Sequence, residues 1–166
     1  LGLIKEKGDA IWKQCIPDSN EVDLDTGLID PLCEEEDSPV PGLTHRYPDR
    51  VLLLVSNRCA MYCRFCTRKR KVGDANKNPS WNDVLDGMNY IEENEEIRDV
   101  LLSGGDPLML DDMILEKIIK NVYEILEQRK NAIIRIGTRI PCVLPQRITP
   151  ELCSMLKKYQ PIYINT

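Results

Sequence analysis

The chain of 166 residues carries 22 Lys and Arg against 27 Asp and Glu, which gives a formal net charge of −5 with its single His neutral. This acidic balance argues against general binding to nucleic acid or to anionic membranes. Hydrophobic residues make up 42% of the chain, as in a globular domain, and no apolar run is long enough to span a bilayer. The N-terminus also lacks the basic and apolar regions of a signal peptide, so we expect a cytoplasmic protein. Because the chain opens at Leu1 and stops inside a strand-like run, we expect a piece of a longer protein.

Residues 1–44 predict an irregular N-terminal arm that lies against a core beginning near His45. Hydrophobic periodicity is weak in this region, and acidic residues accumulate, most densely at 34–37. Residues 8–14 hint at one helical turn, and the prolines at 38–42 favour extended or turning backbone. A disordered acidic tail is the alternative interpretation.

Residues 45–166 alternate between short apolar runs and helical segments. The apolar runs predict strands at 51–55, 98–103, 132–137 and 161–164. Helix starts are predicted at the capping pair Ser80 and Asp83, at Asp111 and Asp112, and at Thr149 followed by Pro150. Strands separated by helices in this way predict an α/β fold with a parallel sheet, either open and doubly wound or part of a TIM-like (β/α) barrel. In both architectures ligands bind at the carboxyl ends of the strands.

Three of the seven cysteines, Cys59, Cys63 and Cys66, lie close together immediately after the first of these strands. Thiolates bind zinc or iron-sulfur clusters, and structural zinc usually takes four protein ligands arranged in CxxC pairs. Only three ligands are present here, which suits a 4Fe-4S cluster with one iron left open to a small molecule. The alternatives are a zinc ion with Cys142 or Cys153 as the fourth ligand, or simply reduced thiols.

The CxxxCxxC spacing after a first barrel strand resembles that of the radical S-adenosylmethionine (SAM) enzymes. The resemblance implies a partial radical SAM barrel at 45–166, truncated at its C-terminal end. It also implies that Cys59, Cys63 and Cys66 ligate the cluster and that SAM chelates the open iron through its amino and carboxylate groups. By the same resemblance Phe65 lies near the adenine, whereas the alternative is an aromatic side chain in the core.

The second predicted strand ends in a glycine motif made of Ser103, Gly104, Gly105 and Asp106. Paired glycines let the backbone approach a ligand closely, and an acid just beyond a strand can receive an ammonium group. By itself such a motif is usually a tight turn, but it resembles the motif of the radical SAM family that binds the methionyl amino group. After the third strand, Thr138 and Arg139 offer a hydroxyl and a guanidinium to the ribose or carboxylate of the cofactor. A structural ion pair is the alternative for Arg139.

A narrower resemblance, to the lysine 2,3-aminomutase family, rests on residues 30–32, 38–50, 66–68, 135–139 and 145–149. It implies a 4Fe-4S cluster, SAM and pyridoxal 5′-phosphate (PLP), and the transfer of an amino group from Cα to Cβ of L-lysine to give L-β-lysine. Arg46, Tyr47 and Arg50 then hold PLP, because two guanidiniums and a phenol suit a phosphate. Arg68 binds the substrate α-carboxylate. The alternative for Arg46 and Arg50 is that they neutralise the acidic arm. The Schiff-base lysine of this family lies beyond residue 166.

This resemblance also predicts the partners: an amino-acid substrate, an electron donor such as flavodoxin or ferredoxin, and other copies of the full-length chain in a homo-oligomer, with no nucleic acid or membrane. The basic run at 69–71 would suit nucleic acid, but the acidic composition argues against it. Glutamate 2,3-aminomutase, a radical SAM enzyme acting on RNA and a zinc-binding module are the competing functions. We expect His45 to be structural and the scattered cysteines to serve packing; these are Cys15, Cys33, Cys142 and Cys153.

Overall fold

The computed structural model of the chain describes residues 2–23 and 28–166. Its centre is a sheet whose strands follow chain order: β1 (Leu43–Tyr47), β2 (Arg50–Ser56), β3 (Asp99–Gly104), β4 (Ile133–Gly137) and β5 (Ile162–Asn165). Strands β2 to β5 run parallel, which confirms the predicted parallel sheet. β1 was not predicted; it pairs antiparallel with β2 at the edge of the sheet. Only Leu43 of β1 is buried, so the strand lacks the apolar pattern that reveals the others.

The described helices are α1 (Ala10–Cys15), α2 (Asn20–Asp23), α3 (Trp81–Glu93), α4 (Asp112–Leu126), α5 (Ile140–Val143) and α6 (Pro150–Leu156). Short 3₁₀ turns follow the same order: η1 (Ala75–Lys77), η2 (Pro107–Met109), η3 (Pro145–Arg147) and η4 (Lys157–Tyr159). The predicted starts are confirmed, since Ser80 and Asp83 form a capping box and the Thr149 hydroxyl accepts from the N–H of Leu152. The Asp111 side chain makes no cap hydrogen bond, and Asp112 supplies the negative charge of the first turn.

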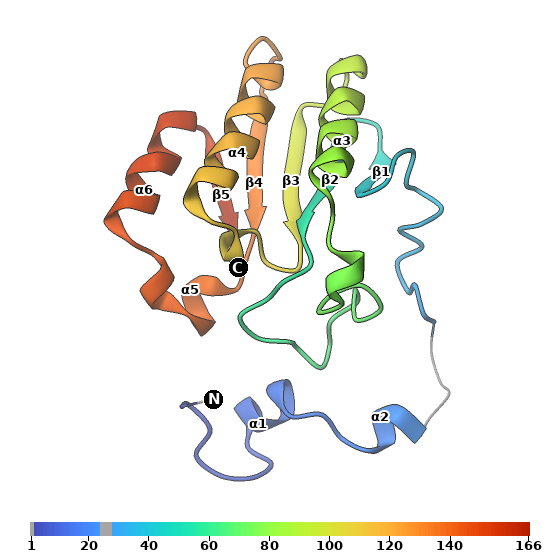
Figure 1. Cartoon of the computed structure of the whole chain (residues 1–166), viewed down its shortest axis with the longest axis vertical. Coiled ribbons are helices and arrows are strands. Elements are labelled where there is room, and N and C mark those ends of the chain that lie inside the picture. The colour runs from blue at the N-terminus through green and yellow to red at the C-terminus, as the bar shows by residue number, and fades with distance from the viewer. Residues whose placement is uncertain (1, 24–27) are drawn as a thin grey trace.

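The order of the strands separates the two predicted architectures. A doubly wound sheet reverses its strand order and carries helices on both faces. Here each parallel strand is added beside the preceding one, and α3, α4 and α6 lie together on one face of the sheet, as Figure 1 shows. Their apolar stripes pack on strand residues that include Leu53, Leu102 and Ile136. This is the arrangement of part of a (β/α) barrel.

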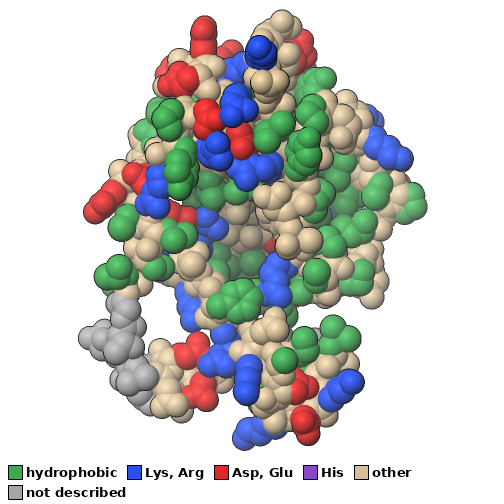
Figure 2. All heavy atoms as spheres, turned by 180° about the vertical axis from the view of Figure 1, so that it is seen from behind, with side chains coloured by type: hydrophobic (Ala, Val, Ile, Leu, Met, Phe, Trp, Pro, Cys, Tyr) green, Lys and Arg blue, Asp and Glu red, His purple; other side chains and the backbone are tan. Residues whose placement is uncertain are grey.

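The opposite face of the sheet carries no helix among the described residues and holds partly exposed side chains such as Leu52, Leu101 and Arg135. Figure 2 views the molecule from behind and shows basic side chains gathered over this face among hydrophobic ones. In a barrel this face becomes the interior. The loops that follow β2, β3 and β4 meet at the carboxyl edge, and α1 and α2 lie beyond that edge (Figure 1).

The boundary that we expected between residues 44 and 45 falls inside β1. No helix in the described ranges, 2–23 and 28–166, is both long and apolar enough to cross a membrane.

Candidate cofactor-binding site

The loop that carries the cysteines is fixed to the glycine motif at the end of β3. The N–H of Gly105 donates to the carbonyl of Ser56 at 2.6 Å, and the N–H of Asp106 donates to that of Arg58 at 2.7 Å. Gly104 has a φ of +119°, and a Cβ atom there would lie 2.1 Å from the Ser56 carbonyl oxygen. A Cβ at Gly105 would lie 2.4 Å from the Arg58 oxygen. The close approach that the glycines permit is therefore to the protein's own backbone, immediately before Cys59.

Asp106 joins the loops that follow β3 and β4. Its side chain is only 5% exposed. One carboxylate oxygen accepts from the Thr138 hydroxyl at 2.6 Å and from the N–H of Leu108 at 3.1 Å, and the other accepts from the N–H of Arg139 at 2.8 Å. All three donors are neutral, and no described basic side chain forms an ion pair with this carboxylate. Its negative charge is therefore available to attract a cation to the site.

The three cysteines share a cavity with the other residues predicted to bind the cluster and SAM. This cavity of about 310 Å³ lies at the carboxyl ends of β2, β3 and β4. Its lining includes Cys59, Cys63, Phe65, Cys66, Arg68, Ser103, Gly104, Gly105, Asp106, Thr138 and Arg139. Residues from three separate loops therefore line one cavity. The position of each motif, directly after a predicted strand, had indicated this arrangement.

The cysteine side chains offer soft donors without converging on one point. Burial raises the pKa of Cys59 to about 12, and Asp106 and the neighbouring thiols add to this rise. The thiol therefore keeps its proton at neutral pH until a bound metal displaces it. No group of three or more His, Cys, Asp or Glu in the described ranges is arranged around a single metal ion. Ligands of a four-iron cluster bind different irons, so they need a shared cavity rather than a common point, and the donor set fits such a cluster.

The surroundings of these residues differ from those that the alternative interpretations require. Cys142 and Cys153 are exposed, and neither lines the cavity of the three cysteines. Phe65 is 62% exposed, so the alternative of a core aromatic is wrong. The Arg139 guanidinium lies 5.2 Å from the Phe65 ring centroid and donates to the Cys63 sulfur at 2.6 Å. Arg139 forms no ion pair with a described carboxylate, which is contrary to the structural alternative.

The residues predicted to hold PLP line a second cavity of about 220 Å³ on the uncovered face of the sheet. Arg46 donates to Asp37 at 2.6 Å and to the carbonyl of Leu32, so it also neutralises the arm, as the alternative held. Arg50 pairs with Asp49 at 2.9 Å and lies 5.7 Å from the ring centroid of Tyr47. The hydrogen bond from Arg50, and after it that from Arg98, lower the pKa of Asp49 to about 2.

Two further charged residues of the second cavity were not singled out from the sequence. Arg135 reaches the cavity from β4 and pairs with the buried Asp99 at 2.7 Å. An arginine inside the otherwise apolar strand Ile133–Gly137 was the available signal. Glu34, from the arm, is buried and also lines this cavity. Arg68 lines both cavities and therefore lies where they meet.

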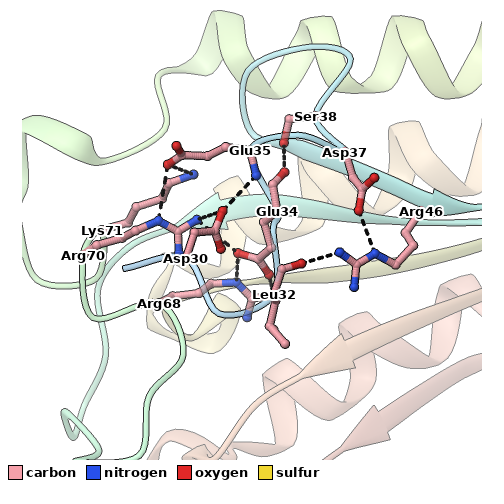
Figure 3. Close-up of polar contacts among 10 residues, drawn as sticks. All are labelled: Asp30, Leu32, Glu34, Glu35, Asp37, Ser38, Arg46, Arg68, Arg70 and Lys71. Atoms are coloured by element: carbon pink, nitrogen blue, oxygen red, sulfur yellow. Dashed lines mark hydrogen bonds and ion pairs between the residues drawn. The ribbon is translucent and has the colours of Figure 1, made fainter. Parts of the chain in front are cut away.

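The acidic arm lies against the basic segment that follows Cys66. Figure 3 shows Arg68 paired with Glu34, while Arg70 lies 2.9 Å from Asp30 and Lys71 lies 3.6 Å from Glu35. Lys69 pairs with Glu21 at 3.3 Å. The basic run that suggested nucleic acid is thus covered by carboxylates of the same chain. The complementary charges of 34–37 and 68–71 are compatible with this contact but do not by themselves specify it.

Outside the two cavities, one expectation is wrong. Cys33, Cys142 and Cys153 are exposed rather than packed, because they lie in surface turns or on the outer side of a short helix. The side chain of Cys15 lies outside the described residues. His45 contacts the Tyr90 hydroxyl through Nδ1 at 2.9 Å, in keeping with a structural role.

Residues 53–166 match the radical SAM superfamily. The chain belongs to this superfamily. It is 53% identical over 165 residues to the L-lysine 2,3-aminomutase of Methanococcus maripaludis, covering 98% of this chain and 37% of that protein. It is 55% identical to the enzyme of the same name from Fusobacterium nucleatum, covering 94% of this chain and 36% of the relative. The glutamate 2,3-aminomutase of Clostridioides difficile is 46% identical, over 95% of this chain and 37% of that enzyme. This radical SAM chain thus spans less than two fifths of the length of these relatives.

Proposed function

We propose that this chain is part of a radical SAM and PLP-dependent aminomutase that converts L-lysine to L-β-lysine. The observation that carries the proposal is the position of Arg68, which lines both the cavity of the three cysteines and the cavity of the arginines. An amino acid held there by its carboxylate lies between the two predicted cofactors. The similarity to named lysine enzymes supports the same assignment.

Each cofactor has a set of residues that fits it. Cys59, Cys63 and Cys66 supply soft sulfur ligands for a 4Fe-4S cluster. The unpaired negative charge of Asp106 suits the methionyl ammonium group of SAM, and the exposed ring of Phe65 suits the adenine. Ser103, Gly104, Gly105, Thr138 and Arg139 complete the lining of the same cavity. When bound, the cluster and SAM supply the one-electron chemistry, and PLP carries the migrating amino group.

The second cavity fits the phosphate of PLP. Arg46, Tyr47 and Arg50 line it together with Arg68 and Arg135, and guanidiniums bind phosphate oxygens well. Among the described residues, no lysine lines this cavity or the one that the cysteines share with Asp106, and Lys69 lines only a separate hollow beside the cysteine loop. We therefore assign the Schiff-base lysine to the part of the relatives' length that this chain does not span.

The proposal includes the partners and location expected from the sequence. These are an external electron donor such as flavodoxin or ferredoxin, a homo-oligomeric full-length enzyme and a cytoplasmic location. The free thiols of Cys33, Cys142 and Cys153 support a reducing compartment. We also propose that the arm, residues 1–44, and the partial barrel, residues 45–166, are two structural units. Glutamate 2,3-aminomutase is the second candidate, because one relative carries that name at 46% identity.

Anaerobic reconstitution of the full-length protein with iron and sulfide tests this function. We expect a brown protein that forms β-lysine from L-lysine when SAM, PLP and a reductant are added. Replacing Cys63 by Ser should abolish iron binding, whereas replacing the exposed Cys153 by Ser should leave the iron content unchanged. A colourless protein that retains one zinc ion would refute the cluster. Turnover of L-glutamate without turnover of L-lysine would favour the second candidate.

A further inference from the structure

The acidic arm presents one buried carboxylate to Arg68. Glu34 is 6% exposed, whereas the adjacent Glu35 is 64% exposed. Arg68 donates from Nε to one Glu34 oxygen at 3.1 Å and from Nη2 to the other at 2.5 Å, and Figure 3 shows this paired contact. Two parallel hydrogen bonds of this kind fix the orientation of a guanidinium as well as its position.

The contact uses only one edge of the Arg68 guanidinium. A guanidinium has two edges that can bind a carboxylate, one formed by Nε and Nη2 and the other formed by Nη1 and Nη2. Glu34 occupies the first edge. Nη1 has no hydrogen-bond partner among the described residues. It is also not buried, so a ligand can reach it. The second edge therefore remains open, on a residue that lines both cavities.

Glu34 is itself held firmly by the fold of the arm. Its carbonyl oxygen accepts from the Ser38 hydroxyl at 2.5 Å, and the next N–H along the chain, that of Glu35, donates to Asp30 at 3.0 Å. A second guanidinium, that of Arg70, lies 3.8 Å from the Glu34 carboxylate. Displacing this carboxylate would leave a charge buried without a partner, which is costly. These contacts hold the Glu34 carboxylate in a fixed position beside Arg68.

We propose that Glu34 is a positioning residue that orients Arg68 to bind the substrate α-carboxylate through its Nη1–Nη2 edge. The inference rests on the proposed function, because it takes the substrate to be an α-amino acid. The opposite role is that Glu34 occupies the carboxylate site and competes with the substrate. The two roles predict changes of opposite sign in substrate affinity when Glu34 is replaced.

The experiment measures binding without turnover. Full-length protein loaded with its cluster and PLP, but without SAM, is titrated calorimetrically with L-lysine and with 1,5-diaminopentane, which lacks only the carboxylate. We expect Glu34→Ala to raise the dissociation constant of L-lysine by about tenfold or more and to leave that of the diamine unchanged. Glu34→Gln keeps the shape but loses the charge, so it should weaken lysine binding less. Glu34→Asp should partly restore the affinity lost in the alanine variant. The matched control, Glu35→Gln, removes the neighbouring exposed carboxylate and should change neither constant.

Steady-state kinetics of the loaded enzyme give a second measurement. A positioning role raises the KM for lysine more than it lowers kcat, and unchanged iron content shows that the variants are folded. Unchanged or tighter lysine binding in both Glu34→Ala and Glu34→Gln would overturn the proposal, and tighter binding would establish competition instead. A wild-type protein that fails to prefer L-lysine over the diamine refutes the proposed function, irrespective of Glu34. If the substrate is glutamate, the same comparison is made with 4-aminobutyrate as the ligand without the α-carboxylate.

Discussion

Replacing Gly104 by Ala tests whether the cysteine loop is anchored on β3. The residue has a φ of +119°, where a side chain costs about 1–3 kcal/mol. A Cβ atom would also lie 2.1 Å from the Ser56 carbonyl oxygen, so the loop after β2 must move away from β3. Overpacking of this kind costs about 1–3 kcal/mol, and loss of the hydrogen bond from Gly105 to the same oxygen costs about 1 kcal/mol more.

The total expected loss in the free energy of unfolding is about 3–7 kcal/mol, a large part of the stability of an ordinary domain. The assay is urea unfolding of the full-length protein, followed by the fluorescence of its tryptophans. Gly137→Ala is the matched control at the end of the neighbouring strand β4. Its Cβ would lie no closer than 3.5 Å to another atom, and its φ is not positive, so we expect a change within about 0.5 kcal/mol.

The iron content of the two variants gives an independent measurement. Displacement of the loop immediately before Cys59 should lower the iron bound after reconstitution of Gly104→Ala, while Gly137→Ala should bind iron normally. If Gly104→Ala unfolds within about 1 kcal/mol of the control, a close approach of the loop to β3 is not needed for the fold. The assignment of the glycines to backbone contact would then be wrong.

Three further predictions concern single side chains. Asp106→Asn keeps the shape of the buried side chain but removes its charge. It should weaken SAM binding, measured by calorimetry, by about tenfold or more, and an unchanged affinity would refute the ammonium assignment. Phe65→Ala removes an exposed ring, so it should weaken SAM binding while changing the free energy of unfolding by less than about 0.5 kcal/mol. A large loss of stability would show instead that the ring packs in the core. Thr149→Ala removes the hydroxyl that caps Leu152 at the start of α6 and should cost about 1 kcal/mol in urea unfolding, whereas Thr149→Ser should cost almost nothing.

The parts of the fold that were predicted from the sequence are those with strong local signals. The start of α3 at Ser80 follows from a side chain that binds its own backbone three residues later. The parallel strands were predicted from short apolar runs separated by helical segments. In the structure these strands lie side by side, and helices bury one face of the sheet. β1 was missed because its polar residues face the second cavity and solvent, so its pairing with β2 depends on tertiary contacts.

The candidate site was predicted where a single segment of chain carries a whole motif. Cys59, Cys63 and Cys66 are close in sequence, and the parallel sheet brings Asp106 and Arg139 to the same cavity because the ends of parallel strands share an edge. Glu34 and Arg135 were not predicted, since their roles depend on partners that are far away along the chain. Opposite charges separated by 34 residues, as in the pair of Glu34 and Arg68, specify no contact until the fold is known.

The four arginines of the second cavity share one arrangement, which bears on the phosphate site that we propose there. In each case Nε donates to a carboxylate: Arg46 to Asp37, Arg50 to Asp49, Arg68 to Glu34 and Arg135 to Asp99. Of these carboxylates only that of Glu34 belongs to a residue lining the cavity. Three of the guanidiniums are therefore held through Nε by carboxylates of residues outside the cavity lining, and that of Arg68 is held by one within it. Within the described ranges Nη1 of each of the four has no protein partner. Holding the donors in place before the ligand arrives reduces the entropy lost on binding. The carboxylates thus limit the net positive charge of the cavity and orient the guanidiniums that we propose to bind the phosphate. Removing any one of them should therefore both loosen its arginine and raise the local positive charge.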